Sequence, residues 1–255
     1  MTIQQTIEQL QDLRLMGLLE AWQQQQQSPT YHDLSFDERF GLMIQQEYTR
    51  RLNQRLQRRL REAQLPMTAR LDQVDFQVRR GVRKAQFLEL AQGQWVNNQL
   101  NLILLGPTGI GKSFLAVVLA DCLCQRQYSV RYVKTANLLL EIRFAKADGS
   151  FPKLRKQLAS FDLLILDEWL RDPIPTLEAR DLLDLLDDRY RNHSTLFISQ
   201  IPIEQWHPQI QDQTIADAML DRIVHDSIRL PLKGESMRKL TSPLNQVNNP
   251  TSENN

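Results

Sequence analysis

Residues 104–113 read "LLGPTGIGKS", and this stretch decides the fold. From Gly106 onward it fits the pattern G-x-x-x-x-G-K-[ST] at every fixed position. An apolar run, "NLILL", leads into it and a helical segment, "FLAVVLADCLC", follows, which is the strand–loop–helix context of a phosphate-binding loop. In such a loop the glycines let successive backbone N–H groups point at a phosphate, and the next helix adds the positive end of its dipole. We therefore expect the loop to hold a nucleoside triphosphate.

The residues of this loop have separate tasks. Lys112 is expected to reach the β- and γ-phosphates, and the Ser113 hydroxyl can bind Mg²⁺. The other loop residues surround the phosphates. The predicted nucleotide-binding residues are Gly106, Pro107, Thr108, Gly109, Ile110, Gly111, Lys112, Ser113 and Phe114.

A second apolar run, "FDLLILDEWL", ends in two acidic residues, Asp167 and Glu168, and Asp167 follows Lys112 by 55 positions. Asp167 is placed to hold Mg²⁺ together with Ser113. Glu168 is placed to orient or deprotonate the attacking water, which is the arrangement of ATP hydrolases. The alternative is a strand that ends in polar residues at the surface.

A third apolar run narrows the class of nucleotide-binding protein. "STLFISQIP" ends in the polar residues Ser199 and Gln200. In a parallel sheet this end lies beside the Asp-Glu strand, so either side chain could sense the terminal phosphate or hold the water. The sequence contains no N-K-x-D stretch, which argues against a guanine-specific GTPase. A small-molecule kinase would need an arginine-rich lid, and it seldom keeps an Asp-Glu pair at the end of the second apolar run.

Two arginines near the end of the chain have two interpretations. Arg222 lies in "MLDRIVH" and Arg238 in "KGESMRKL". Each could be an ordinary surface arginine. In a hydrolase that works as an assembly, such arginines stabilise transferred charge across a subunit boundary.

Composition and motif spacing exclude several other classes. The chain has 255 residues, of which 42% are apolar and 24% charged, as in an ordinary soluble globular protein. It contains no apolar run of about 18 residues and begins without a secretion signal, so we expect a cytoplasmic protein with no membrane contact. Cys122 and Cys124 are expected to be small apolar residues in a helix. The four histidines have no metal-ligand spacing.

Three zones follow one another along the chain. Residues 1–66 are predicted to form a small helical domain for DNA binding or oligomerisation. Its second helix is predicted to begin at Ser35, which forms a capping box with Glu38, and to end before Pro66. Residues 67–240 alternate strand-like and helical segments. Residues 241–255 carry one charge and no apolar periodicity, which predicts a disordered tail.

The net charge of +1 hides a segregation of charge. Residues 50–84 contain eleven basic and three acidic residues, whereas residues 162–188 contain nine acidic and two basic ones. The helix "EYTRRLNQRLQRRLRE" carries leucines at every fourth position from Leu52 to Leu60. Its basic side chains could track DNA phosphates, or its leucines could pack on a neighbouring helix or a second subunit. The candidate DNA-binding residues here are Arg50, Arg51, Arg55, Arg58 and Arg59.

The order of these motifs resembles the AAA+ ATPases. More narrowly, it resembles the IstB-type transposition helper proteins, relatives of the DnaC helicase loader and the DnaA initiator. The resemblance covers about residues 5–240. It includes "LSFDERFGLMIQQEYTRRLNQRLQRRLREAQLP", "LDQVDFQVRRGVRKAQFLELA", the P-loop (Walker A), "ADGSFPKLRKQLASFDLLILDE", "LFISQIPIEQWH" and "DRIVHDSIRLPLKGESMRK".

The resemblance implies an α/β fold: a parallel five-stranded sheet flanked by helices, with a small all-α N-terminal domain. Few residues follow Arg238, so the helical lid of this class must be minimal or absent. By position, Gln200 corresponds to sensor 1, Arg222 to the arginine finger and Arg238 to sensor 2. Sensor 1 is more usually Asn or Thr, and Ser199 is the alternative. Arg238 could act within its own subunit, on a neighbour or not at all.

The resemblance also implies a function. The expected protein binds ATP and Mg²⁺, forms a homo-oligomer on duplex DNA with little sequence preference, bends or remodels it, and helps a transposase resembling IstA to choose its target. It would be associated with the nucleoid in the cytoplasm of a prokaryotic cell. A second DNA-facing group is expected near the helical insertion of the initiator subgroup, namely Lys146, Lys153, Arg155 and Lys156. "RRGVRK", residues 79–84, could frame the adenine or join the DNA surface.

Three other functions fit parts of the pattern. A replicative helicase loader would share the ATP site and act on a helicase ring. A DNA-binding scaffold would use ATP only to gate assembly. A small-molecule kinase would show no turnover that depends on DNA.

Overall fold

The structure is a computed structural model that describes residues 2–78, 80–234 and 236–237. Arg238 and the predicted disordered tail, residues 241–255, lie outside the described residues. The chain divides into two compact units, Met1–Arg58 and Arg59–Asn255. The predicted domain boundary at residue 66 stays a prediction.

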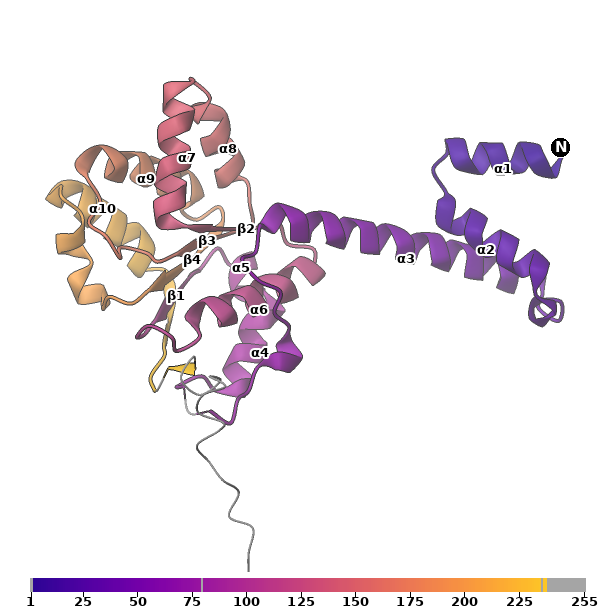
Figure 1. Cartoon of the computed structure of the whole chain (residues 1–255), viewed down its shortest axis with the longest axis horizontal. Helices are drawn as coiled ribbons and strands as arrows, with labels where there is room; N and C mark the ends of the chain where they lie inside the picture. Colours follow the sequence, from indigo (N-terminus) through magenta and orange to yellow (C-terminus); the bar gives the residue numbers. More distant parts are fainter. Residues whose placement is uncertain (1, 79, 235, 238–255) are drawn as a thin grey trace, which may run out of the picture. The chain divides into compact units, whose positions relative to one another are not determined.

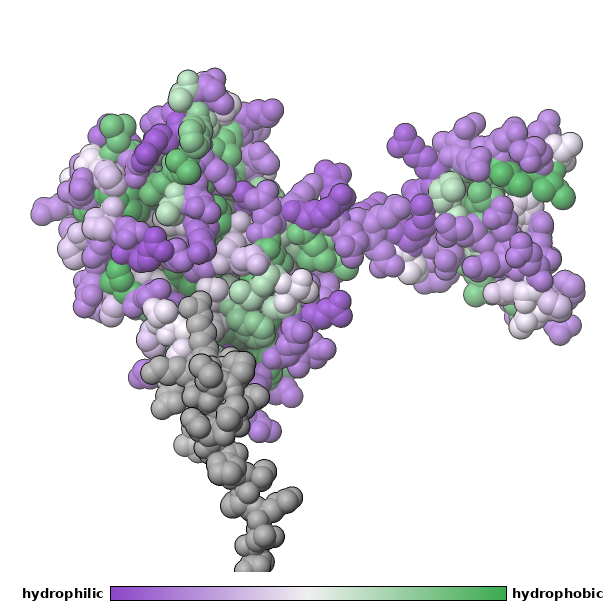
Figure 2. Space-filling model, viewed as in Figure 1, coloured by the Kyte–Doolittle hydropathy of each residue, from purple (hydrophilic) through white to green (hydrophobic). Residues whose placement is uncertain are grey.

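The N-terminal unit consists of helices. They are α1 (Ile3–Asp12), α2 (Met16–Gln27), the short 3-10 helix η1 (Pro29–Tyr31) and the larger part of α3 (Phe36–Ala63) (Figure 1). The capping box predicted at the start of α3 is confirmed, because the Glu38 carboxylate accepts hydrogen bonds from the Ser35 amide at 2.8 Å and the Ser35 hydroxyl at 2.7 Å. The visible face of α3 is largely hydrophilic (Figure 2).

Helices α2 and α3 meet at Gly17. A Cβ at this position would stand 2.9 Å from the Glu47 Cα, so glycine is what lets the two backbones approach. The Glu47 carboxylate accepts hydrogen bonds from the amides of Gly17 at 2.7 Å and Leu18 at 3.3 Å and thereby caps α2. Burial alone would raise the pKa of Glu47, but these bonds and the Arg51 guanidinium lower it below its ordinary value.

The C-terminal unit is built on a five-stranded sheet in which every pairing is parallel. The strand order is β2-β3-β4-β1-β5. The strands are β1 (Asn101–Leu105), β2 (Val130–Lys134), β3 (Leu163–Asp167), β4 (Ser194–Ser199) and β5 (Ser227–Pro231). The three apolar runs noted in the sequence form β1, β3 and β4. Because β3 pairs with β4, the Asp-Glu end lies beside the polar end of the third run, as expected.

Helices flank this sheet (Figure 1). They are α4 (Lys84–Gln92), α5 (Gln94–Asn97), α6 (Lys112–Gln125), α7 (Thr135–Ala147), α8 (Phe151–Ala159), α9 (Thr176–Arg189) and α10 (Gln213–Val224), with 3-10 turns at Leu71–Gln73, Ile203–Gln205 and His207–Gln209. The described chain has no helix that is both long and apolar enough to span a membrane. After β5 the structure describes residues 232–234 and 236–237, so the expectation of a minimal or absent lid stays a prediction.

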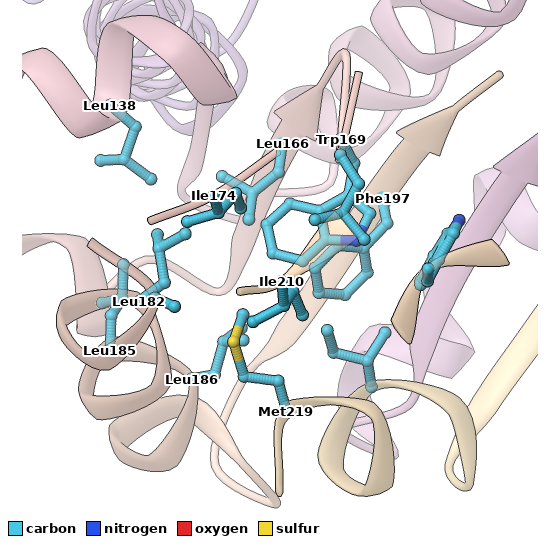
Figure 3. Close-up of a cluster of buried hydrophobic side chains, with 14 of the residues drawn as sticks. Leu138, Leu166, Trp169, Ile174, Leu182, Leu185, Leu186, Phe197, Ile210 and Met219 are labelled. Carbon is cyan, nitrogen blue, oxygen red and sulfur yellow. The ribbon is translucent and has the colours of Figure 1, made fainter. Parts of the chain in front are cut away.

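A buried cluster between β3, β4, α9 and α10 fixes the end of β3 (Figure 3). The rings of Trp169 and Phe197 meet edge to face with centroids 5.0 Å apart, and Trp206 lies 6.3 Å from Trp169 in the same manner. Trp169 is fully buried and directly follows Glu168. The acidic end of β3 is therefore held by the core immediately behind it.

A buried arginine joins α8 to β4. Arg189, at the end of α9, is 1% exposed and forms no ion pair with a carboxylate of the described chain; its guanidinium donates to carbonyl and hydroxyl oxygens instead. The acceptors are the carbonyls of Leu158 (2.8 Å), Ala159 (3.2 Å), Phe161 (2.9 Å) and Ser194, and the hydroxyl of Thr195 (3.0 Å). The cation thus satisfies the terminal carbonyls of α8 that no helical amide can reach.

Candidate nucleotide-binding site

The predicted phosphate loop borders a cavity of about 710 Å³ at the carboxyl end of the sheet. Two of its glycines have left-handed backbone conformations, Gly109 with φ 83° and Gly111 with φ 96°. A Cβ on Gly109 would collide with the Ser236 hydroxyl, and one on Gly111 would stand 3.1 Å from the Arg80 Nη1. Any larger residue would therefore be strained and would obstruct the loop.

Lys112 lies at the mouth of this loop. Its ammonium donates hydrogen bonds to the carbonyls of Gly106 at 2.7 Å and Pro107 at 2.9 Å. Burial lowers the pKa of Lys112, and the nearby Asp167 carboxylate partly opposes this shift. The ammonium is thus a desolvated charge beside the loop amides, where a phosphate would bind.

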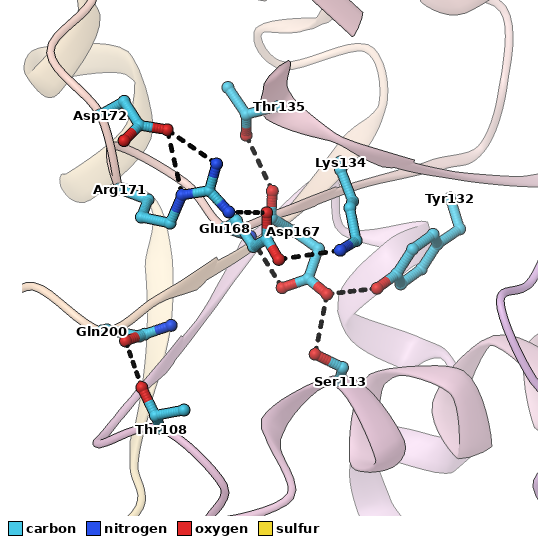
Figure 4. A network of polar contacts seen from close by, with 10 residues as sticks. All are labelled: Thr108, Ser113, Tyr132, Lys134, Thr135, Asp167, Glu168, Arg171, Asp172 and Gln200. Atoms are coloured by element: carbon cyan, nitrogen blue, oxygen red, sulfur yellow. Dashed lines mark hydrogen bonds and ion pairs between the residues drawn. The ribbon is translucent and has the colours of Figure 1, made fainter. Parts of the chain in front are cut away.

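Asp167 is the centre of a polar network at the end of β3 (Figure 4). Its carboxylate accepts hydrogen bonds from the Ser113 hydroxyl at 2.7 Å, the Glu168 amide at 2.7 Å and the Tyr132 hydroxyl. The Thr135 hydroxyl donates to the Asp167 carbonyl at 3.0 Å. Burial and the hydrogen bond to Asp167 raise the pKa of Tyr132, so this phenol stays protonated and remains a donor.

The donors and acceptors in this network fit Mg²⁺. A carboxylate and a hydroxyl are hard oxygen ligands, and Mg²⁺ at a nucleotide needs only one or two protein groups because phosphates and water complete its shell. The described residues contain no cluster of three or more His, Cys, Asp or Glu that could hold a metal ion. Ser113 and Asp167 are therefore the residues that would hold Mg²⁺ with the nucleotide.

Glu168 lies at the rim of the cavity between two cations. Its carboxylate pairs with the Lys134 ammonium at 2.9 Å and with the Arg171 guanidinium at 2.5 Å (Figure 4). Its backbone has φ 57°, a left-handed conformation that is rare outside glycine and concentrated at functional sites. The Glu168 side chain is thus held in one position by its two ion pairs.

The two polar residues at the end of β4 have different surroundings. Ser199 is fully buried, and its hydroxyl donates to the Trp169 carbonyl at 2.9 Å and accepts from the Ile201 amide at 3.1 Å. Gln200 is exposed, lines the cavity and accepts a hydrogen bond from the Thr108 hydroxyl at 2.5 Å. The geometry favours Gln200 over Ser199 as the group that senses the terminal phosphate.

Substituting these two residues separately should distinguish their roles. We expect Gln200→Ala to lower ATP turnover about 10-fold or more without loss of stability, because it removes a polar group that lines the cavity where the γ-phosphate would bind. Ser199→Ala should instead lower the free energy of unfolding by about 1 kcal/mol, because it leaves the Trp169 carbonyl unpaired. Steady-state turnover and thermal unfolding of both variants measure this. A larger loss of turnover for Ser199→Ala than for Gln200→Ala would reverse the assignment.

Several residues of the cavity were not singled out in the sequence. Met67, Gln73, Asp75 and Met237 line it, and none of them belongs to a local motif. Arg80, from the ambiguous stretch 79–84, also lines the cavity; it is 5% exposed, and its Nη2 donates to the Asp75 carbonyl at 2.6 Å. These residues reach the loop from a distant part of the chain.

Arg222 lies at the opposite end of the sheet. Its carbonyl accepts a hydrogen bond from the Asn101 side chain at 3.1 Å, and Asn101 begins β1, whereas the phosphate loop follows the end of β1. A strand of this length spans about 16 Å. The guanidinium of Arg222 pairs with Asp187 and donates to the Ala218 carbonyl at 2.7 Å. Arg222 is therefore not brought together with the other predicted catalytic residues of the same subunit.

The candidate DNA-binding residues differ in availability. Lys146 pairs with Asp181 at 2.8 Å, and Arg155 pairs with Asp188 at 2.5 Å, so two of them neutralise the acidic face of α9. Lys153 and Lys156 are exposed. On α3, Arg51 and Arg55 are both exposed, and Arg51 pairs with Glu47 at 2.6 Å. Contact of these residues with DNA stays a prediction.

Comparison with known proteins places the chain in a family. The family described as IstB-like ATP binding protein matches residues 8–244. The chain belongs to this family. An insertion sequence ATP-binding protein of Sinorhizobium fredii (strain NBRC 101917 / NGR234) is 37% identical over 234 residues, which cover 92% of this chain and 96% of that protein. The resemblance stated from the sequence is thereby confirmed, and the nucleotide expected at the loop is ATP.

Solved structures support the predicted fold class. The DnaC helicase loader is similar with a TM-score of 0.52 at 15% identity, over 65% of this chain and 97% of that one. DnaA from Aquifex aeolicus, solved with AMPPCP, has a TM-score of 0.52 at 18% identity, over 69% of this chain and 54% of that one. At such identities the likeness concerns the fold alone. The parallel five-stranded AAA+ core with an N-terminal helical region is confirmed.

Proposed function

We propose that the protein is a Mg²⁺-dependent ATP hydrolase that assembles on duplex DNA and assists a partner transposase in choosing or remodelling its target. The observation that carries the proposal is the pair of acids at the end of β3. Asp167 is hydrogen-bonded to Ser113 at 2.7 Å, and Glu168 stands beside it at the rim of the cavity. A protein that only binds ATP has no need of the second acid.

Each residue has a separate part in hydrolysis. The loop amides and Lys112 hold the phosphates, and Ser113 and Asp167 hold Mg²⁺, which neutralises the charge that develops on the phosphate oxygens. Glu168 accepts a proton from the attacking water, whose oxygen forms a bond to the γ-phosphorus while the bond to ADP breaks. Gln200 orients this water or the γ-phosphate. Glu168 can act only when its ion pairs with Lys134 and Arg171 loosen or turn, because both of its oxygens are engaged.

The place of Arg222 supports action on a neighbouring subunit. It lies across the sheet from its own phosphate loop, so it could stabilise the transferred charge only at the site of another copy. Hydrolysis would then depend on assembly. The rate of ATP hydrolysis would then determine how long the assembly persists.

Two further observations support the proposal that the partners are a transposase and DNA. The Sinorhizobium relative is named for an insertion sequence, and such an element needs a transposase to move. Exposed basic residues, among them Lys153, Lys156 and Arg55, can contact DNA phosphates without reading bases. We therefore expect DNA binding with little sequence preference and a strong dependence on salt.

A mixing experiment tests the proposal. Arg222→Ala and Lys112→Ala should each lower turnover at least about 100-fold, in the presence of duplex DNA. In a mixture, an Arg222→Ala subunit has an intact loop and can receive Arg222 from a Lys112→Ala neighbour. Turnover of the mixture should therefore exceed the sum of the two variants.

The matched control is Arg229→Ala, which changes an exposed arginine on β5 and should leave turnover unchanged. Turnover of the mixture equal to the sum of its parts would rule out action between subunits. Turnover that duplex DNA leaves unchanged, together with no retention of DNA by ATP, would contradict the proposed function itself.

A further inference from the structure

Arg80 is a buried arginine whose charge the described chain does not neutralise. It is 5% exposed and lines the nucleotide cavity. A guanidinium has five N–H donors, and within the described residues the hydrogen bond of this one runs from Nη2 to the Asp75 carbonyl at 2.6 Å. No carboxylate of the described chain forms an ion pair with it, and burial lowers the pKa of Arg80 although the Asp75 carboxylate opposes this shift. A buried charge ordinarily has a partner, so the cation requires one from outside the chain.

A comparison with Arg189 makes this difference clear. Arg189 is also buried, but four carbonyls and one hydroxyl of the chain accept its hydrogen bonds. Arg80 instead borders a cavity of about 710 Å³, which the phosphate loop also lines. The chain therefore satisfies one buried guanidinium with its own atoms and presents the other to whatever the cavity binds.

The guanidinium of Arg80 lies against the N-terminus of α6. Gly111 is the N-cap of this helix, and a Cβ added to it would stand 3.1 Å from the Arg80 Nη1. The N-terminus of a helix carries a partial positive charge, which disfavours a second cation beside it. The Lys112 ammonium, at the mouth of the same loop, adds to the repulsion. A phosphate at the loop would be attracted by all three positive groups, so the arrangement favours a bound polyphosphate.

The backbone that carries Arg80 is fixed to the sheet. The Arg80 carbonyl accepts a hydrogen bond from the Lys233 amide at 3.0 Å, and the Arg80 amide donates to the Val78 carbonyl at 2.8 Å. Gly81 has φ 80°, and a Cβ on it would stand 2.9 Å from the Pro231 carbonyl, so glycine lets this segment lie on the end of β5. Strand β5 pairs with β1, which leads into the phosphate loop. Arg80 is thus preorganised beside the loop, which reduces the entropy lost on binding.

We propose that Arg80 binds the phosphate chain of the nucleotide in its own subunit. A guanidinium matches phosphate oxygens with two parallel N–H donors, whereas Lys112 acts as a point charge. Among the described residues that line the cavity, these two are the cations. The inference rests on the nucleotide site of the proposed function and assigns Arg80, from the stretch 79–84, to that site. Unlike Arg222, Arg80 needs no neighbouring subunit to reach the nucleotide.

The first experiment measures the binding of fluorescent ATP and ADP analogues to the full chain at low protein concentration and without DNA. Arg80→Met should weaken the binding of both nucleotides at least about 10-fold, because it removes charge-assisted hydrogen bonds to their phosphates. In turnover assays KM should rise while kcat stays within about threefold, as for a group that binds substrate and transition state alike. The matched control is Arg229→Met, which changes an exposed arginine on β5 and should leave both affinities within about twofold.

The second experiment identifies the part of the nucleotide that Arg80 contacts. Inorganic tripolyphosphate, which has neither base nor ribose, competes with the fluorescent nucleotide. Arg80→Met should weaken the binding of tripolyphosphate by about the same factor as that of ATP, because the lost contact is to phosphate. A loss of affinity for ATP with unchanged affinity for tripolyphosphate would assign Arg80 to the base or the ribose and would overturn the proposal.

The third experiment separates binding from folding by thermal unfolding. Removing a buried charge that has no counter-ion should not lower the midpoint of the chain without nucleotide, but it should reduce the rise of the midpoint on addition of ATP. A midpoint that falls by several degrees without nucleotide would show a structural role and overturn the proposal, as would an unchanged affinity of Arg80→Met for ATP. An unsubstituted chain that binds no ATP would contradict the proposed function instead, so the two failures are distinguishable.

Discussion

Glu168→Gln is expected to lower ATP turnover by about 100-fold or more while ATP binding is retained. A general base contributes about 10²–10⁴-fold to a rate, and the amide of glutamine cannot accept the proton of the attacking water. The loop, Lys112 and Asp167 are unchanged, so the nucleotide should still bind. Because the assembled state would no longer be dissolved by hydrolysis, the variant should also remain on duplex DNA in the presence of ATP. Steady-state turnover, a fluorescent ATP analogue and DNA retention measure the three effects.

The control for this experiment is Glu204→Gln, which changes an exposed carboxylate on the 3-10 turn after β4. It should leave turnover within about twofold of the unsubstituted chain, as is usual for a surface change away from the site. If Glu168→Gln hydrolysed ATP at the rate of this control, another group would have to activate the water. If it lost ATP binding as well, the ion pairs of Glu168 with Lys134 and Arg171 would be holding the site together.

Arg189→Met should lower the free energy of unfolding of the C-terminal unit by more than about 3 kcal/mol. The substitution keeps most of the buried volume but removes the donors that satisfy four carbonyls and one hydroxyl. A buried acceptor that loses its donor costs about 1–3 kcal/mol, and several lose theirs together. The midpoint of thermal unfolding, followed by tryptophan fluorescence, should fall by several degrees or more.

Arg180→Met is the matched control, because Arg180 is exposed on the same helix α9. It should change the midpoint by no more than a surface substitution does. Equal midpoints for the two variants would mean that the carbonyls find other donors. A loss of turnover without a loss of stability would point instead to a role of Arg189 in function.

The sequence was sufficient for those parts of the site that are local in the chain. The phosphate loop and the Asp-Glu end of β3 are each a short run with one geometry, and the Ser35 capping box is decided by residues three apart. Apolar runs predicted β1, β3 and β4 because buried parallel strands are apolar on both faces. The family membership and the fold class agree with this interpretation.

Other parts depend on tertiary contacts that leave no local pattern. The fifth strand, "SIRLP", contains an exposed arginine at its centre, so its sequence does not resemble a buried strand. Tyr132 and Lys134 contact the two acids from β2, more than thirty residues away in the chain. The sequence predicted that the basic residues Lys146 and Arg155 contact DNA. Only the fold shows that they pair with acidic side chains of α9.

The junction between β2 and α7 connects a long helix mechanically to the chemistry. Tyr132 touches the Asp167 carboxylate, Thr135 the Asp167 carbonyl and Lys134 the Glu168 carboxylate, all within four consecutive positions. From Thr135 onward α7 extends for 13 residues, a rod of about 20 Å that ends near Lys146. A displacement of the far end of α7 would be transmitted to residues 132–135, which contact both Asp167 and Glu168. Any ligand that tilts α7 would thus move together the two carboxylates that are proposed to hold Mg²⁺ and to activate water, Asp167 and Glu168.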